Sequence, residues 1–167
     1  DSINDYIILS ENITYIKNQE KIFTNGITKA IIDSRYEFES KNVLFLKNKM
    51  ILSSSAKSVI KDKDLKLYKV EKFRYFLNKG SLKAKKIEKI NNYTKSINER
   101  DFLYFDDGII NIKSKDFIAG KTKIKVKKNI FDISKNDPRI YGVSSNKKNE
   151  ITTINKGIFT SCESNDK

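Results

Sequence analysis

Apolar and polar residues alternate along most of this chain, and the clearest example lies between residues 121 and 128. Lysine occupies every second position from 121 to 127, while Thr122, Ile124 and Val126 fill the positions between. Successive side chains of a strand point to opposite faces, so this segment has one solvated and one buried face. A helix would spread the same lysines around its whole circumference. The pattern therefore predicts a β-strand.

Similar short segments, bounded by polar residues and six dispersed glycines, recur along the chain. No segment carries a helical apolar stripe over three turns. Short strands at a spacing of about 8–12 residues indicate an all-β, antiparallel sandwich or jelly roll. The predicted strands cover residues 6–16, 27–33, 35–39, 43–46, 50–52, 65–70, 73–77, 102–105, 109–113, 117–119, 122–126, 130–133, 151–154 and 158–160.

Local turn signals divide these strands. Asn25-Gly26 and Asp106-Asp107-Gly108 are predicted hairpin turns, and Lys47-Asn48-Lys49 is a predicted turn into the next strand. The segment 82–90 fits neither the helical nor the strand period. A weak internal repeat recurs at about 20–25 residues, as expected of stacked strand units.

The length of 167 residues and the mass of 19.4 kDa predict one domain, residues 1–162, followed by a frayed tail, 163–167. The chain starts at Asp1 without an apolar leader, so any targeting segment is expected to lie outside this fragment of a larger protein. No window approaches the roughly 18 apolar residues of a spanning helix, and the fragment is expected to be soluble.

The net charge of +13 has two readings. The 30 Lys, 25 Ile and 17 Asn residues all use A/T-rich codons, so an AT-rich genome would raise all three counts together. An anionic partner is the other reading, although the four arginines supply little of the bidentate contact that phosphate and guanine favour. The lysine-rich faces thus fit solvated surfaces, an anionic amphiphile or nucleic acid.

The composition gives little support for a catalytic site or a metal site. Histidine is absent and there is one cysteine, which excludes a Ser-His-Asp triad and a Cys/His zinc site. The acidic groups Asp62/Asp64 and Asp101/Asp106/Asp107 lie at predicted turns, where aspartate bonds to nearby backbone amides. We expect no enzyme activity, no cofactor and no metal site. Cys162 is either a buried thiol or half of a bridge to a region outside this chain.

Two C-terminal segments carry a family resemblance. They are Asn136-Asp137-Pro138-Arg139 through Gly142-Val143-Ser144-Ser145, and Lys156-Gly157-Ile158-Phe159-Thr160-Ser161-Cys162. Both resemble the periplasmic N-terminal (OstA-like) domain of the LptD family, which assembles lipopolysaccharide in the outer membrane. The earlier strands are similar to the generic repeat shared with LptA-like bridge proteins.

The resemblance implies an open, V-shaped antiparallel β-jelly roll in the periplasm, as part of an outer-membrane protein. Its groove would carry lipopolysaccharide acyl chains, and a sheet edge would pair with an LptA-like bridge protein. The outer-membrane barrel of the same chain, with its lipoprotein plug, would receive the lipid, and Cys162 would form a disulfide with that missing region. Family members usually carry another cysteine near the mature N-terminus, and none precedes Cys162 here.

Strand phase selects the residues expected to line the groove, and a register error of one residue would invert any of them. A freestanding LptA-like bridge protein is the alternative function, and a basic nucleic-acid-binding β-domain is a more remote one. The expected lining residues are Tyr36, Phe38, Val43, Phe45, Leu65, Leu67, Phe73, Tyr75, Ile110, Ile112, Ile124 and Val126.

Overall fold

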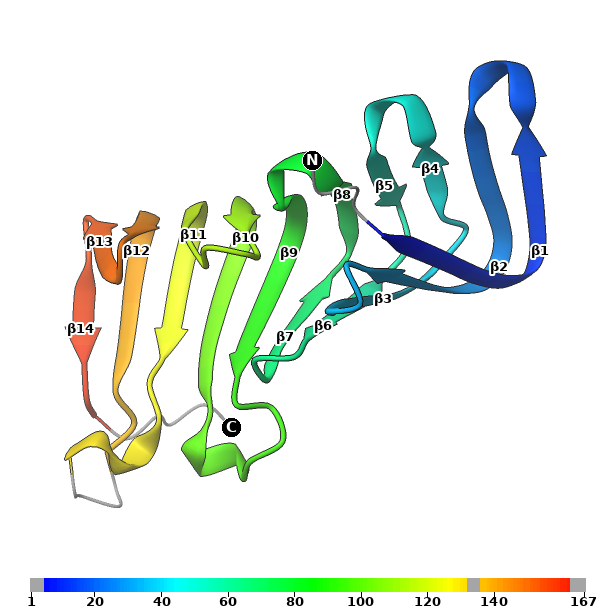
Figure 1. The fold of residues 1–167 in the computed structure, drawn as a ribbon. Helices are drawn as coiled ribbons and strands as arrows, with labels where there is room; N and C mark the ends of the chain where they lie inside the picture. The colour runs from blue at the N-terminus through cyan, green and yellow to red at the C-terminus, as the bar shows by residue number, and fades with distance from the viewer. Residues whose placement is uncertain (1–4, 132–135, 163–167) are drawn as a thin grey trace.

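The computed structural model describes residues 5–131 and 136–162, and these form strands joined by short turns and 3-10 segments (Figure 1). The predicted tail, 163–167, lies outside the described residues. The strands are β1 (Tyr6–Ile16), β2 (Lys21–Ile32), β3 (Tyr36–Lys41), β4 (Leu44–Leu46), β5 (Ile51–Ser54), β6 (Ser58–Asp62), β7 (Lys66–Val70), β8 (Lys72–Phe76), β9 (Ser81–Asn91), β10 (Asp101–Asn111), β11 (Phe117–Lys125), β12 (Arg139–Lys148), β13 (Ile151–Asn155) and β14 (Ile158–Thr160). The 3-10 segments are η1 (Lys17–Gln19), η2 (Lys47–Lys49), η3 (Leu77–Lys79), η4 (Ile97–Glu99) and η5 (Lys128–Phe131).

The strands form one 14-stranded antiparallel sheet in which the chain runs back and forth between neighbours. Long strands such as β2 and β9 pair with two different partners on one side. The first part of β2 pairs with β4 and its second part with β3, while β9 pairs first with β8 and then with β7. The sheet is therefore folded along a line that crosses every pass of the chain.

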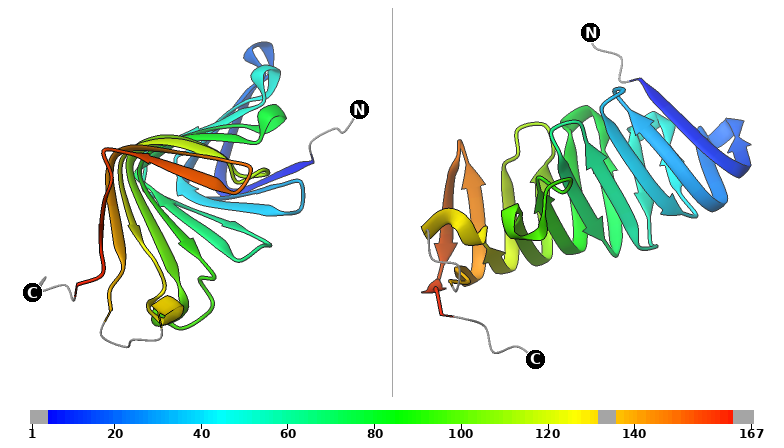
Figure 2. Two further views of the ribbon diagram at one scale, coloured as in Figure 1. Left: turned by 90° about the vertical axis from the view of Figure 1, so that its left-hand side faces the viewer. Right: turned by 90° about the horizontal axis from the view of Figure 1, so that it is seen from below.

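This fold line divides the sheet into two arms that diverge as a V, which the end-on view of Figure 2 shows. We call arm I the part that contains β4, β5, β8 and β13, and arm II the part that contains β3, β6, β7 and β14. Strands β1, β2, β9, β10, β11 and β12 contribute one half to each arm. The prediction of an all-β, open V-shaped antiparallel jelly roll is confirmed.

Each pass bends at the fold line through an unpaired residue or a short break between strands. Positive φ angles occur at several bends, including 98° at Gly26, 51° at Asn42, 49° at Lys86 and 46° at Lys121. Each bend turns the strand, and most shift its inward-facing positions by one, as from Ala84 to Ile87 in β9. In β2 the inward positions Thr24 and Thr28 keep the same phase across Gly26. The bends lie at Glu11, Gly26, Asn42, Ser55–Lys57, Glu71, Lys86, Asp106, Lys121, Val143 and Lys156–Gly157.

These bends explain why two predicted hairpin turns were wrong and why one segment fitted neither the helical nor the strand period. Asn25-Gly26 and Asp106-Asp107-Gly108 are not hairpin turns, because they lie inside β2 and β10 where each strand crosses between the arms. The segment 82–90 is a strand whose inward residues are Leu82 and Ala84 before the bend and Ile87 after it. The strand alternation is broken within this segment because the bend at Lys86 shifts the inward-facing positions by one residue.

The true repeat is longer than the predicted 20–25 residues. Three 3-10 hairpin turns at arm I end in a left-handed residue at Glu20, Met50 and Gly80, at intervals of 30 residues. The predicted turn at Lys47-Asn48-Lys49 is the second of these. The predicted strand 130–133 was also wrong in its described part, since η5 occupies Lys128–Phe131. In one repeat the chain thus runs from arm I to arm II and back.

The facing surfaces of the arms form one apolar core, and paired hydroxyls lie close to the fold line. Thr24 and Thr28 share a hydrogen bond of 2.6 Å across the bend of β2. Ser40 and Ser58 share one of 2.7 Å between β3 and β6. These buried side chains satisfy one another where the backbone ladder is interrupted.

Gly26 tests the bend directly. Its φ of 98° is poorly accessible to other residues, while a Cβ there would meet no atom within 4 Å. Gly26→Ala should therefore lower the free energy of unfolding by about 1–2 kcal/mol through backbone strain alone, as measured by urea denaturation. The neighbouring Ile27→Ala is the control, because Ile27 is 74% exposed and its truncation should change little. Equal effects of the two substitutions would contradict a strained bend.

Candidate functional site

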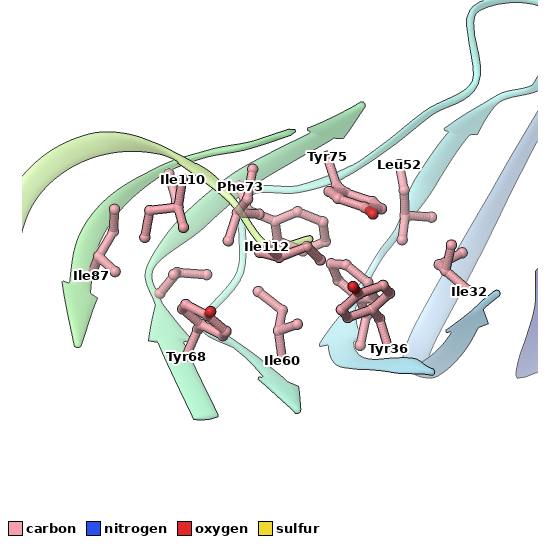
Figure 3. Close-up of a cluster of buried hydrophobic side chains, with 14 of the residues drawn as sticks. Ile32, Tyr36, Leu52, Ile60, Tyr68, Phe73, Tyr75, Ile87, Ile110 and Ile112 are labelled. Atoms are coloured by element: carbon pink, nitrogen blue, oxygen red, sulfur yellow. The ribbon is translucent and has the colours of Figure 1, made fainter. Parts of the chain in front are cut away.

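The inner face of the V holds most of the residues that strand phase selected. Tyr36, Phe38, Val43, Phe45, Phe73, Tyr75, Ile110 and Ile112 are each at most 3% exposed and belong to one buried cluster (Figure 3). Ile124 is half-buried and packs against the same cluster. These positions face inward, and their role in holding a ligand stays a prediction.

Three of the selected residues lie elsewhere. Leu65 is 39% exposed and has a positive φ in the turn before β7, so it does not face the groove. On β7 the inward positions are Tyr68 and Val70, which places Leu67 on the outer face. The choice was wrong because Leu67 and Tyr68 are both apolar and the alternation could not decide between them. Val126 lies beyond the end of β11 and is half-buried.

Aromatic side chains from both arms meet in the middle of the V. The rings of Phe38 on arm II and Tyr75 on arm I lie 4.9 Å apart, and Phe38 lies 5.6 Å from Phe73. Sequence reasoning missed several other members of this cluster, among them Ile32, Leu52, Ile60, Tyr68, Leu82 and Ile87. The inward face of Leu82 and Ile87 became visible only with the bend at Lys86, which shifts the alternation by one residue.

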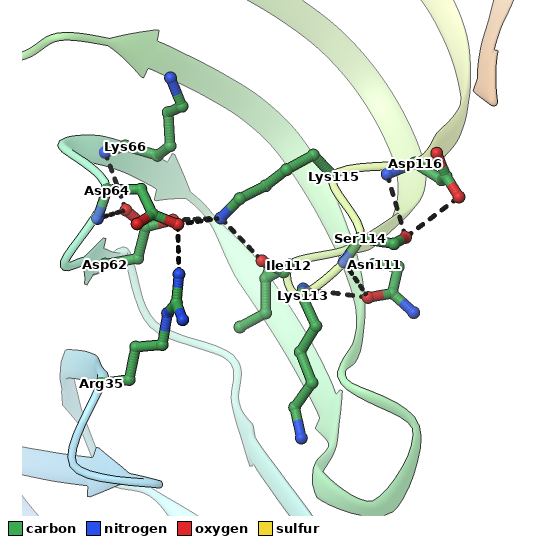
Figure 4. A network of polar contacts seen from close by, with 10 residues as sticks. All are labelled: Arg35, Asp62, Asp64, Lys66, Asn111, Ile112, Lys113, Ser114, Lys115 and Asp116. Atoms are coloured by element: carbon green, nitrogen blue, oxygen red, sulfur yellow. Dashed lines mark hydrogen bonds and ion pairs between the residues drawn. The ribbon is translucent and has the colours of Figure 1, made fainter. Parts of the chain in front are cut away.

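A turn closes the mouth of the V over this cluster. Residues 111–116 connect β10 to β11 at arm I, and the buried Ile112 lies in the middle of the cluster (Figure 3). Lys115 from this turn pairs with Asp62 of arm II at 2.5 Å and also donates a hydrogen bond to the Ile112 carbonyl (Figure 4). We call this turn the strap.

Further charges hold the strap in place. Asp62 is fully buried, and its other carboxylate oxygen accepts hydrogen bonds from the backbone N–H groups of Asp64 and Lys66. Asp64 pairs with Arg35, as Figure 4 shows. Lys113 pairs with Asp33 at 3.2 Å. The Arg35 hydrogen bond lowers the pKa of the Asp64 carboxyl below its ordinary value. The arms are thus joined by ion pairs at the centre of the mouth.

At both ends of the stack the inner face is open. Ile13 and Tyr15 of β1 lie opposite Thr24 and Ile22 on the inner side, yet each is 49% exposed. At the other end Phe159 of β14, which faces inward beside Ile140, is 58% exposed. The apolar interior therefore continues from a sealed centre to uncovered ends.

One lysine lies inside this apolar interior. Lys89 is 4% exposed and lies on the inner face between Tyr68 and Leu103, its partners on β7 and β10. Its ammonium lies 5.7 Å from the centre of the Tyr68 ring. No carboxylate of the described residues lies within ion-pair distance of it. Burial first, and then the charges of Lys147, Lys66 and Lys115, lower the pKa of Lys89 to about 8, against an opposing effect of Asp62.

Two polar groups beside Lys89 also lack partners. The Tyr68 hydroxyl and the Asn91 side-chain oxygen are buried without a hydrogen bond to any described residue. Burial raises the pKa of Tyr68 above its ordinary value, so its hydroxyl stays neutral and able to donate. Buried polar groups are almost always paired, which makes this group of side chains unusual.

Other kinds of site leave no trace in the part of the chain that the structure describes. It contains no group of three Cys, Asp or Glu side chains arranged to hold a metal ion. Cys162 is a free, exposed thiol just beyond β14. No helix among the described residues has the length and hydropathy to cross a membrane.

Comparison with known proteins adds one finding on the fold. No model of a known protein family matches the sequence, and no curated protein matches it. Among solved structures, the chain is similar to LptH from Pseudomonas aeruginosa, the LptA-homologous periplasmic component of the conserved lipopolysaccharide transport device. The TM-score is 0.59 at 9% identity, over 70% of this chain and 82% of that one. The two proteins share the V-shaped jelly roll.

The buried charge of Lys89 makes the stability of this protein depend on pH. Its pKa is about 8 when folded and about 10.5 when unfolded, so the cost of burying the charged form is complete below pH 8. That cost disappears as the pH rises to 10.5. The difference between the two pKa values corresponds to about 3 kcal/mol in the free energy of unfolding. Lys89→Met should therefore be more stable than the wild type at pH 7.

Denaturation of both proteins between pH 7 and pH 10.5 should show this advantage shrinking as the pH rises. The control is Lys83→Met, on the exposed part of the same strand. The free energy of unfolding of Lys83→Met should differ from that of the wild type by the same amount at every pH. An advantage of Lys89→Met that is independent of pH would contradict a charged, buried Lys89.

Proposed function

We propose that this protein binds lipopolysaccharide in the periplasm and passes it along an LptA-like bridge, holding acyl chains between the two arms. The observation that carries the proposal is the apolar cluster on the inner face of the V, together with the exposed apolar side chains of Tyr15 at one end and Phe159 at the other. The similarity in shape to LptH, a component of a lipopolysaccharide transport device, supports the same conclusion.

Acyl chains suit this interior on physical grounds. Burying hydrocarbon is favourable by roughly 0.8 kcal/mol per methylene and requires no directional chemistry. The centre of the V is filled by its own side chains, so a chain that enters there must separate the arms. The groups that resist separation are the ion pairs of the strap. Exposed pairs such as Lys113–Asp33 contribute about 0–1 kcal/mol each, which leaves Lys115–Asp62 as the main polar tie.

The ends of the sheet provide the means of assembly. Strand β1 forms one edge and β13 with β14 the other, each with one side unpaired within the described residues. Exposed strand edges pair readily with strands of another molecule. Pairing through these edges would align the V of one module with that of the next, and the exposed Ile13, Tyr15 and Phe159 would then lie inside a continuous trough.

Photo-crosslinking tests the inner face with matched neighbours. A photoreactive residue at Ile124 or Phe159 faces inward, while one at Lys123 or Ile158 faces outward on the same strands. In cells that make lipopolysaccharide, irradiation should give adducts from the two inward positions and few from the outward ones, detected by immunoblotting for lipopolysaccharide. Capture that is equal at inward and outward positions would refute transport between the arms.

A second candidate is the periplasmic domain of an LptD-like outer-membrane protein. The exposed thiol of Cys162, which follows the last strand, favours it, since a freestanding bridge has no evident use for such a thiol. In this case the cysteine would pair with one in a barrel region of the same chain.

Non-reducing electrophoresis of the full-length protein separates the two candidates. An LptD-like protein should migrate differently with and without reductant, and Cys162→Ser should abolish the difference. A freestanding bridge should show the same mobility under both conditions. The variant should still bind lipid in either case, since Cys162 is exposed and lies outside the buried cluster.

A further inference from the structure

The interior of the V contains a group of cations that the binding of hydrocarbon does not explain. Lys66 and Lys89 both face inward on arm II, where Lys66 lies opposite Asn91 and Lys89 opposite Tyr68. Their strand positions are diagonal neighbours, within reach of long side chains. Neither lysine has an ion-pair partner among the described residues.

The opposite arm adds positive charge to the same space. Lys115 of the strap lies near Lys66, because Asp62 pairs with Lys115 and also accepts a hydrogen bond from the Lys66 backbone. The charges of Lys115 and of Lys147 on β12 both contribute to the lowered pKa of Lys89. Lys147 is itself inward, since it lies opposite the buried Phe117.

The nearby carboxylates are already engaged. Asp62 pairs with Lys115, Asp64 with Arg35 and Lys115, and Glu150 with Lys147. Asp101, which lies opposite Asn91, accepts a hydrogen bond from the backbone of Lys127. The space around Lys89 and Lys66 therefore keeps an uncompensated positive charge in an apolar setting.

Burying a cation without a partner is costly, whereas an anion brought into the same space gains strong charge-assisted hydrogen bonds. The Tyr68 hydroxyl, which can donate to a ligand, and the Asn91 side-chain oxygen, which can only accept, are the two other polar atoms without a partner there. A tetrahedral or planar oxyanion would satisfy the cations and the hydroxyl together. An uncharged head group would leave the two ammonium groups unpaired.

We propose that the inner face of arm II is a binding site for the anionic group of an amphiphile, a phosphate or a carboxylate, held by Lys89 and Lys66 with the Tyr68 hydroxyl as a donor. The proposal rests on the proposed function, because the attached hydrocarbon occupies the V. Lys115 lies beside the site on the strap, so an arriving anion competes with Asp62 for its ammonium. Binding the anion thereby weakens the main polar tie between the arms.

The test uses three amphiphiles with the same saturated chain: dodecyl phosphate, dodecanoate and the uncharged glycerol ester of dodecanoic acid. Their affinities for the full chain are measured by calorimetry at pH 7 below micelle-forming concentrations. At least one anionic amphiphile should bind about tenfold more tightly than the uncharged one, the value of one charge-assisted contact. A preference for dodecyl phosphate indicates a phosphate ligand, and a preference for dodecanoate a carboxylate ligand.

Substitutions test whether the preference for an anionic amphiphile arises at this site. Lys89→Met and Lys66→Met should each bring the ratio of the anionic to the uncharged affinity close to one, whatever the change in the affinity for the uncharged ester. Lys83→Met, an exposed position on β9, should keep the preference. Because Lys89→Met removes a buried charge, this variant is expected to fold, and its denaturation curve checks that it does. In the wild type, the pKa of the Lys89 ammonium, followed by NMR, should rise when the preferred anion binds.

The outcomes separate this proposal from the proposed function. Equal affinity for all three amphiphiles, or a preference that survives Lys89→Met, would overturn the anion site and leave the lipid-binding function intact. Failure of all three to bind would overturn the lipid-binding function and the anion site with it.

Discussion

The structure depends on one geometric requirement, that every pass of the chain bends between the two arms at the same level. Bends at Gly26, Asn42, Lys86 and Lys121 adopt positive φ angles, and their stacking along one line turns a flat sheet into a V. Most bends, among them those at Asn42, Lys86 and Lys121, also shift the alternation by one residue, so apolar side chains stay inward on both arms. The apolar core, the strap and the open ends all follow from this shared fold line.

Two opposing interactions act inside the V. Apolar contacts such as Phe38 with Tyr75 hold the arms together, and Lys115–Asp62 ties them at the mouth. The unpaired charge of Lys89 opposes closure, because it is buried without a partner. Under the proposed function, the hydrocarbon would lie between the arms and the buried cation would favour an amphiphile with an acidic head group. Stability and binding are thus linked through the same few side chains.

Much of the fold could be predicted from the sequence. The alternation in segments such as Tyr36–Lys41 and Lys72–Phe76 predicted both the strands and their inward residues, since no bend interrupts them. The predictions failed where a bend or an ambiguous pair intervened, as at Asn25-Gly26 and at Leu67 beside Tyr68. The 30-residue repeat was hidden because its equivalent turn positions carry residues as different as Glu20, Met50 and Gly80.

The sequence by itself determined an antiparallel β-protein with apolar inner faces, because alternation is a local property that each segment carries alone. The tertiary structure decided where the two arms meet, which turn closes the mouth and which charges lie together. Asp62 and Lys115 pair across the V although they are 53 positions apart in the chain, and Lys89 is buried although the segment around it fits neither the helical nor the strand period. Such contacts depend on how distant strands stack, which no local pattern encodes.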